Sequence, residues 1–140
     1  MPHHPLPVPA QAAPGFTLEE MKAFVQRHFE DFVNRRKSDV ALTNFSDGFL
    51  DHDEAGGPVV GPLAAKTMME SAYRLWPDLH VSVEDILAEG DKVMVRNRWS
   101  ATNQSTGRRI QFKGFVLWRF ANRKIVERWA TLTSPEEING

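Results

Sequence analysis

The densest group of side chains able to move a proton is the run Asp51-His52-Asp53, which ends a short apolar segment that starts at Phe49. A carboxylate or imidazole beside an apolar cavity is a common acid or base in proton-transfer chemistry. If the segment 49–53 is a strand, Asp51 and Asp53 point to one side and His52 to the other. A structural interpretation is also open, in which the aspartates cap backbone amides where the strand enters a loop.

Arg128 is the second candidate for chemistry, because a guanidinium can anchor a carboxylate or steady negative charge on an oxygen. The alternative is a salt bridge to Asp51 or Asp53 that satisfies a buried charge. Both interpretations require Arg128 to lie near the strand 49–53.

The stretch from Arg109 to Thr133 is rich in β-branched and aromatic residues and predicts a long antiparallel hairpin. A three-residue turn at 121–123 places Phe120 opposite Lys124 and Gly114 opposite Ala130. Two small residues facing each other predict a hollow lined by larger neighbours. One face of the hairpin then holds Phe112, Gly114, Val116, Trp118, Val126, Arg128, Ala130 and Leu132.

The opposite face of this hairpin is half apolar. It holds Ile125 and Glu127, and Phe115 is expected to stack on Trp129. A half-apolar outer sheet face needs cover, so the sequence predicts a homodimer through this face. A monomer in sedimentation experiments at micromolar concentration would contradict this prediction.

Helices precede the strands along the chain. Thr17 and Glu20 form a capping box that starts a long amphipathic helix. His28 lies on the apolar stripe of this helix, where it can face a cavity or be a hydrogen-bonded core residue. The other expected elements are a short helix at 38–42, a turn at Asp47-Gly48, a helix from Pro62 to Trp76, and strands at 79–89, with a bulge near Asp85, and at 92–102.

This order of elements is typical of an α+β fold in which a curved sheet wraps over helices. A cavity is then expected between the long helix and the concave face of the sheet. Trp118 and Phe112 are expected to line the cavity, whereas Trp76 is expected in the core. Arg96 and Arg98 share one strand face and are expected to pair with carboxylates on the outer side.

Composition limits the remaining possibilities. The length of 140 residues predicts one domain, placed at 16–135, and the prolines at 1–15 predict a flexible arm. The net charge is only -1. No basic stripe favours nucleic acid, and no apolar run is long enough to span a membrane. The chain has no cysteine, which suits a cytoplasmic protein. We expect neither a metal site nor a cofactor, since neighbouring strand residues such as Asp51 and His52 point apart.

Several stretches together resemble a known family: FLDHD at 49–53, WPDLHVSVEDILAEGDKV at 76–93, TGRRIQFKGF at 106–115 and RKIVERW at 123–129. Their order and spacing are similar to those of the SnoaL-like polyketide cyclases, within the nuclear transport factor 2-like superfamily. The resemblance implies a cone-shaped α+β fold, with a curved, mostly antiparallel sheet wrapped over N-terminal helices. It also implies a dimer with a closed apolar pocket and no cofactor.

The resemblance is weaker in the chemistry. Polyketide cyclases of this family use an acidic residue on the last strand together with a nearby histidine. Aligned on Lys124-Ile125, those two positions fall on Ala130 and Val116, neither of which moves a proton. In the related steroid isomerases, the base lies at about the strand end that Asp51 and Asp53 occupy here.

Two functions follow as expectations. The first is a cofactor-free enzyme that cyclises or isomerises a small, mostly apolar carbonyl compound, with proton transfer by Asp51 or Asp53 and charge stabilisation by Arg128. The second is a module that binds a small apolar or aromatic molecule, or dimerises, without catalysis, which the residues at 116 and 130 favour. Fold alone does not decide between them.

Overall fold

The structure, a computed structural model, describes residues 14–54 and 57–138. The predicted arm at 1–15 therefore lies almost wholly outside the described residues. The elements in chain order are α1 (Leu18–Phe29), a wider π-type turn η1 (Glu30–Asn34), α2 (Val40–Asn44), β1 (Phe45–Asp51), β2 (Val59–Val60), α3 (Pro62–Leu75), β3 (His80–Glu89), β4 (Lys92–Thr102), β5 (Arg109–Ala121), β6 (Lys124–Leu132) and β7 (Glu136–Glu137).

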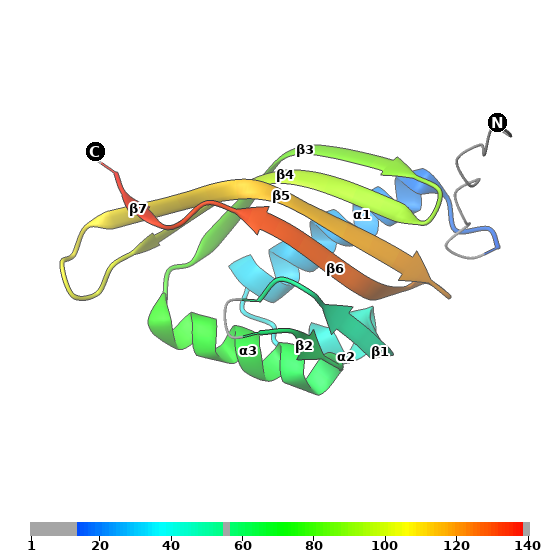
Figure 1. Cartoon of the computed structure of the whole chain (residues 1–140), viewed down its shortest axis with the longest axis horizontal. Coiled ribbons are helices and arrows are strands. Elements are labelled where there is room, and N and C mark those ends of the chain that lie inside the picture. The colour runs from blue at the N-terminus through cyan, green and yellow to red at the C-terminus, as the bar shows by residue number, and fades with distance from the viewer. Residues whose placement is uncertain (1–13, 55–56, 139–140) are drawn as a thin grey trace, which may run out of the picture.

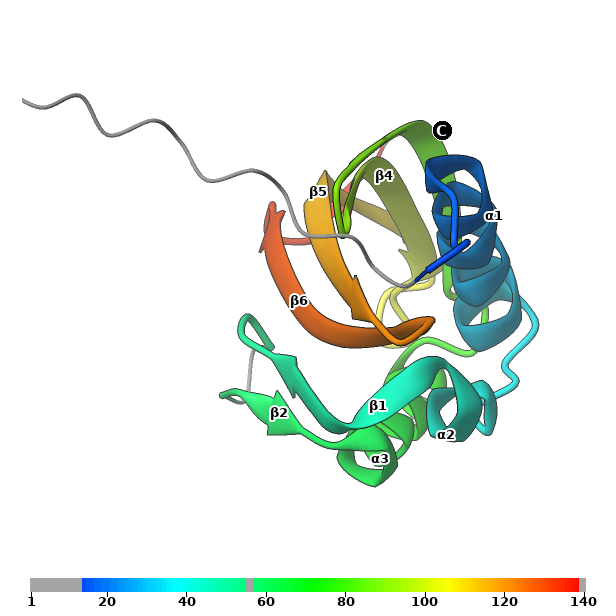
Figure 2. The same ribbon diagram turned by 90° about the vertical axis from the view of Figure 1, so that its right-hand side faces the viewer.

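The strands form one curved sheet in the order β2-β1-β6-β5-β4-β3, and β7 pairs with β5 (Figure 1). β1 runs parallel to β6, while the other neighbours are antiparallel. The sheet bends between β6 and β1, and α1 and α3 lie on the inside of that bend (Figure 2). This arrangement confirms the predicted α+β architecture with a sheet wrapped over helices.

The long helix is fixed at both ends. Thr17 and Glu20 form the predicted capping box at its start. At its far end the Asn34 side chain donates to the Val81 carbonyl oxygen at 3.0 Å and accepts from the Val81 amide at 2.8 Å. This pair of bonds attaches the helix to the edge strand β3. The apolar stripe then packs against the sheet through Met21, Val25, Phe29, Phe32 and Val33, all buried.

Strand β1 begins earlier than the sequence predicted. The expected turn at Asp47-Gly48 is wrong, because both residues lie within β1. The other expected elements agree with the structure to within a few residues, and the pairing of β3 with β4 shifts between Val83 and Asp85, as the predicted bulge requires. The ion pairs Arg96–Asp85 and Arg98–Glu84 lie on partly exposed side chains, as predicted for the outer face.

The hairpin register differs from the prediction by two residues. The turn has two residues, Asn122 and Arg123, with φ of 51° and 63°, so Ala121 rather than Phe120 faces Lys124. A bulge between Arg119 and Phe120 adds a second shift. Side chains alternate along a strand, so a shift of two restores the original face beyond the bulge. Between the turn and the bulge the faces are exchanged, and Ile125 is buried instead of lying on the outer face.

Gly114 consequently has a different role from the one predicted. It faces Leu132, and Ala130 faces Val116, so the predicted Gly114–Ala130 hollow does not exist. A Cβ atom at Gly114 would lie 1.9 Å from the backbone oxygen of Thr131 and 2.9 Å from the Cα atom of Leu132. Glycine is therefore required here by the close approach of the β6 backbone.

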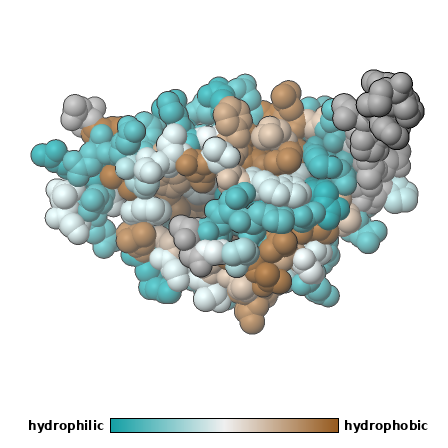
Figure 3. All heavy atoms as spheres, viewed as in Figure 1, coloured by the Kyte–Doolittle hydropathy of each residue, from teal (hydrophilic) through white to brown (hydrophobic). Residues whose placement is uncertain are grey.

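The outer sheet face carries an apolar row formed by Leu87, Met94, Leu117 and Trp129, which are successive neighbours across β3, β4, β5 and β6. Leu87 is 71% exposed and Phe115 is 50% exposed. The expected Phe115–Trp129 stack is wrong, because the register places Phe115 opposite Thr131. The homodimer through this face stays a prediction. Apolar side chains also gather along the lower edge of the molecule in Figure 3. Val60 of β2 and Leu63 of α3 are further exposed apolar residues.

The role of Gly114 can be tested by Gly114→Ala. We expect this change to lower the free energy of unfolding by about 3 kcal/mol, because the added methyl group collides with backbone rather than with a movable side chain. Urea denaturation measures the difference. The matched control is Gly48→Ala in β1, where nothing lies within 4 Å of the added Cβ atom. A loss no larger than that of the control would contradict the close approach.

Candidate functional site

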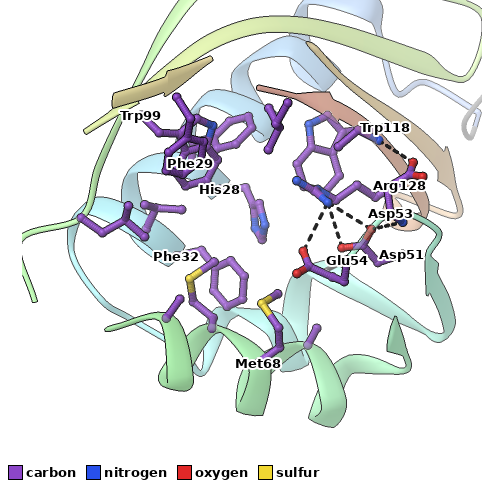
Figure 4. A pocket seen from close by; sticks show the side chains of 18 of the residues that line it. His28, Phe29, Phe32, Asp51, Asp53, Glu54, Met68, Trp99, Trp118 and Arg128 are labelled. Carbon is purple, nitrogen blue, oxygen red and sulfur yellow. Dashed lines mark hydrogen bonds and ion pairs between the residues drawn. The ribbon is translucent and has the colours of Figure 1, made fainter. Parts of the chain in front are cut away.

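A cavity of about 540 Å³ lies between the concave face of the sheet and the helices. Its volume is within the range of sites for small molecules. Most of its wall is apolar. Aromatic rings come from α1, β4, β5 and the end of α3, and one face of α3 contributes Ala65, Met68, Met69 and Ala72. The titratable side chains of the wall are Asp51, Asp53, Glu54, Arg128 and His28 (Figure 4), and Thr131 and Thr133 are further polar lining residues.

Most of the predicted site residues meet at this cavity. It is lined by Asp51, Asp53, Arg128, Phe112, Trp118, Ala130 and His28. Gly114, Val116 and His52 are not among its lining residues. Val116 is fully buried in the core, and Gly114 lies against the β6 backbone. Trp76, expected in the core, is a lining residue and lies 5.7 Å from the Phe112 ring.

Asp51 and Arg128 form a buried ion pair. The two residues are partners in the parallel pairing of β1 and β6. The Nη1 atom of Arg128 donates to both carboxylate oxygens of Asp51 at 3.0 Å, and Glu54 lies 3.5 Å from the same nitrogen. Asp51 is 2% exposed and Arg128 is 8% exposed. The predicted salt bridge is therefore present, and Nη1 of Arg128 is the nitrogen that makes it.

Asp53 holds a different position on the same wall. Its Oδ2 atom accepts a hydrogen bond from the backbone amide of Ala130 at 2.7 Å, and its own amide donates to Oδ1 of Asp51 at 3.2 Å. No described residue donates a hydrogen bond to Oδ1 of Asp53. One carboxylate oxygen is therefore held by the strand, and the other is available at the more exposed side of the cavity.

His52 points to the outer side of the sheet, as the alternation of β1 predicts. Its Nε2 atom lies 2.8 Å from Oε2 of Glu127. Its ring stacks on Trp129 with centroids 4.8 Å apart. The hydrogen bond from His52, followed by that from Arg119, lowers the pKa of Glu127 below its usual value. His52 thus belongs to a polar network on the outer surface and not to the cavity.

His28 is the most deeply buried titratable side chain of the wall. Its ring packs against Phe32, Phe45 and Trp118 with centroids 4.9, 5.0 and 5.4 Å apart. The Nδ1 atom lies 3.0 Å from the amide nitrogen of Asn44. Burial, and secondly the positive charge of Arg128, lower the pKa of His28 to about 3. The imidazole is therefore neutral at any physiological pH.

Sequence reasoning missed two parts of the cavity. Glu54 was not predicted as a site residue, although it directly follows the polar run at 51–53. The wall from α3 follows from the spacing of Ala65, Met68 or Met69, Ala72 and Trp76, which places these residues on one helix face. That stripe was recognised as helical, but nothing in it distinguishes a cavity wall from a packed core.

The curved sheet wrapped over helices defines the class of α+β fold, and comparison with known proteins identifies the family. The model of the SnoaL-like polyketide cyclases matches residues 23–132, and the chain belongs to this family. A search of curated proteins finds no match. The helices of the described residues all lack the length and apolar character that crossing a membrane requires.

Solved structures share the fold. The structure of AclR, a putative hydroxylase from Streptomyces galilaeus, gives a TM-score of 0.72 at 26% identity, and the match covers 84% of this chain and 81% of that chain. A putative SnoaL-like polyketide cyclase from Jannaschia sp. CCS1 gives 0.70 at 21% identity, covering 79% and 83%. A putative polyketide cyclase from Bacillus cereus ATCC 10987 gives 0.71 at 23% identity, covering 93% and 90%.

The ion pair predicts the effect of Arg128→Met. Removing the cation leaves the buried Asp51 carboxylate without a partner, so we expect the free energy of unfolding to fall by about 3–5 kcal/mol. Urea denaturation measures this change. Arg98→Met, which breaks an exposed pair on the outer face, is the control and should cost less than about 1 kcal/mol. Adding Asp51→Asn to Arg128→Met should recover part of the loss. A single-variant loss as small as the control's would contradict the pair.

The neutral state of His28 predicts a pH dependence of stability. An unfolded histidine takes up a proton below its ordinary pKa of 6.5, whereas folded His28 does so only near 3. Between these values the unfolded state binds more protons, so stability falls as the pH is lowered. From pH 7 to pH 5 the wild type should lose about 2 kcal/mol more than His28→Phe. Urea denaturation at both pH values measures this, and equal losses would contradict the prediction.

Proposed function

We propose that this protein catalyses a cofactor-free proton transfer next to the carbonyl group of a small, mostly apolar molecule, leading to cyclisation or isomerisation. The cavity volume, its aromatic wall and its group of carboxylates support this proposal. The observation on which it depends is the Asp53 carboxylate, held on the cavity wall through Oδ2.

Asp53 is the base in this proposal. The family's acid falls on Ala130 in this chain, and Ala130 has no side chain that could replace it. The Asp53 carboxylate, however, accepts the backbone hydrogen bond of that same Ala130. A carboxylate from the end of β1 thus lies beside the position where the resembling cyclases carry theirs. Its free oxygen Oδ1 would take the proton from the carbon next to the substrate carbonyl.

Asp51 and Arg128 support Asp53 rather than share its role. Both oxygens of Asp51 accept hydrogen bonds from Arg128, so this carboxylate is already engaged by the protein. The pair fixes the end of β1 against β6, and with it the position of Asp53 two residues later. Arg128 also lies 5.5 Å from the centre of the Trp118 ring, and its positive charge contributes to the electrostatic field of the cavity.

The alternative is a module that binds a ligand without changing it. The specific observation in its favour is that Ala130 and Val116 occupy the positions of the family's acid and histidine. The two functions differ in whether a bound ketone exchanges its acidic protons.

Exchange of α-protons tests the proposal without knowledge of the natural substrate. Wild-type protein in deuterated buffer should accelerate deuterium uptake by neutral bicyclic ketones such as β-tetralone, measured by proton NMR. In Asp53→Asn the rate should fall by about 100-fold or more, because the amide retains the bond to Ala130 but accepts no proton.

The matched control is Asp47→Asn, which removes an exposed carboxylate of β1 that does not line the cavity. This variant should retain the wild-type rate. Unchanged exchange in Asp53→Asn would exclude Asp53 as the base. Binding of the ketone without any exchange in the wild type would support the binding module instead.

A further inference from the structure

The deep part of the cavity contains a hydrogen-bonding group without a protein partner. The Nε2 atom of His28 is buried and makes no hydrogen bond with any described residue. His28 is 1% exposed and lines the cavity. Figure 4 shows its ring extending from α1 into the space between Phe32 and Trp118. An unpaired polar atom in such a dry site is costly, so a ligand atom that pairs with it would gain affinity.

The hydrogen-bond partner on the opposite side of the ring determines which of the two nitrogens carries the proton. Nδ1 faces the side-chain nitrogen of Asn44 at 3.0 Å, and an amide nitrogen only donates. The side-chain oxygen of Asn44 lies on the other side of the amide, 3.4 Å from the Thr43 hydroxyl, which also donates to the Val40 carbonyl oxygen at 3.1 Å. Nδ1 is therefore an acceptor. Because a neutral imidazole has one N–H group, its proton is on Nε2, and the group offered to the cavity is a donor.

The charges on the cavity wall limit the kind of acceptor that fits. Arg128 is already bonded to Asp51 and lies close to Glu54, and Asp53 adds a further negative charge to the wall. A ligand carboxylate would meet these negative charges at short range, and the Arg128 nitrogen nearest to them is already bonded to Asp51. A neutral carbonyl oxygen accepts the same hydrogen bond without this repulsion.

We propose that His28 is a substrate-positioning residue that binds the carbonyl oxygen of a neutral aromatic or apolar ketone through Nε2–H, and that the site rejects carboxylate-bearing ligands. This inference rests on the proposed function and specifies its substrate class. With the oxygen held at His28, the rest of the molecule lies along the aromatic wall. Its acidic carbon then points toward the side of the cavity where Asp53 lies.

The neutral ring suits this role in the reaction as well. When a proton leaves the carbon next to a carbonyl group, negative charge grows on the oxygen, and a fixed N–H donor stabilises it. An imidazole with a pKa of about 3 remains neutral throughout. It donates a hydrogen bond without carrying a positive charge that would attract anionic ligands.

Binding measurements with three matched probes test the proposal. The probes are naphthyl methyl ketone, isopropenylnaphthalene, in which a methylene group replaces the carbonyl oxygen, and naphthoate. Calorimetry with wild-type protein should rank the ketone first and naphthoate last. In His28→Phe the ketone should bind about tenfold more weakly, while the hydrocarbon should be unaffected. His28→Gln, which restores an N–H donor, should recover part of the loss.

Infrared difference spectra of the ketone labelled with carbon-13 at its carbonyl group separate a hydrogen bond from a packing effect. Relative to the ketone in an apolar solvent, the carbonyl stretch should lie at lower frequency when bound to the wild type. In His28→Phe it should return to the frequency seen in the apolar solvent, and in His28→Gln it should again lie lower. The indole nitrogens of Trp99 and Trp118 are also buried without partners. A shift that survives in His28→Phe but disappears in Trp99→Phe or Trp118→Phe would overturn the proposal, as would tight binding of naphthoate.

Failure of this inference can be distinguished from failure of the proposed function. The probes report binding and a vibrational frequency, and neither depends on turnover. If Asp53→Asn abolishes proton exchange while His28→Phe leaves the ketone's affinity and frequency unchanged, only the role of His28 fails. If the carbonyl frequency shift is lost in His28→Phe but the wild type catalyses no proton exchange, the role of His28 in ketone binding is supported and the enzymatic function is excluded.

Discussion

The buried ion pair between Asp51 and Arg128 joins two strands that lie far apart in the sequence. Taking both charges out of water is costly, and the cost is offset only while each remains beside the other. The pair therefore fixes the end of β1 against the middle of β6. Asp53 and Glu54 follow directly along the chain, so their places on the cavity wall depend on this pair together with the hydrogen bond from the Ala130 amide to Asp53. The bend of the sheet around the cavity passes through the same pair of strands.

Local patterns in the sequence predicted much of the fold, and long-range register limited the rest. Alternation along 49–53 correctly separated Asp51 and Asp53 from His52, because it depends only on neighbouring residues. The hairpin register also depends on the turn and on a bulge. A turn in which Arg123 adopts a positive φ is uncommon for a residue with a long side chain, and nothing in the sequence required the bulge. Phe112, Trp118 and Ala130 kept their predicted face only because the total shift was even.

The origin of the cavity was not visible in the sequence. The expected floor of Gly114 and Ala130 is absent, since Gly114 serves the close approach of two strands. The space arises instead from the distance at which α1 and α3 cover the curved sheet. The short side chains of Ala65 and Ala72 on α3 leave space between that helix and the sheet. Such distances follow from the packing of whole elements, which no single residue pattern specifies, and this explains why Trp76 was placed in the core.

Membership in the cyclase family therefore constrains the shape of the site more than its chemistry. The resemblance to the family predicts its acid and histidine at Ala130 and Val116, two residues that carry no ionisable group. A bound substrate, however, contacts the side chains that line the cavity, whichever strand supplies them. A carboxylate from β1 that bonds to the Ala130 amide presents charge near the same part of the wall. In the proposed mechanism the catalytic carboxylate comes from the neighbouring strand while the cavity is retained, so the side chains at the wall are the proper basis for assigning function.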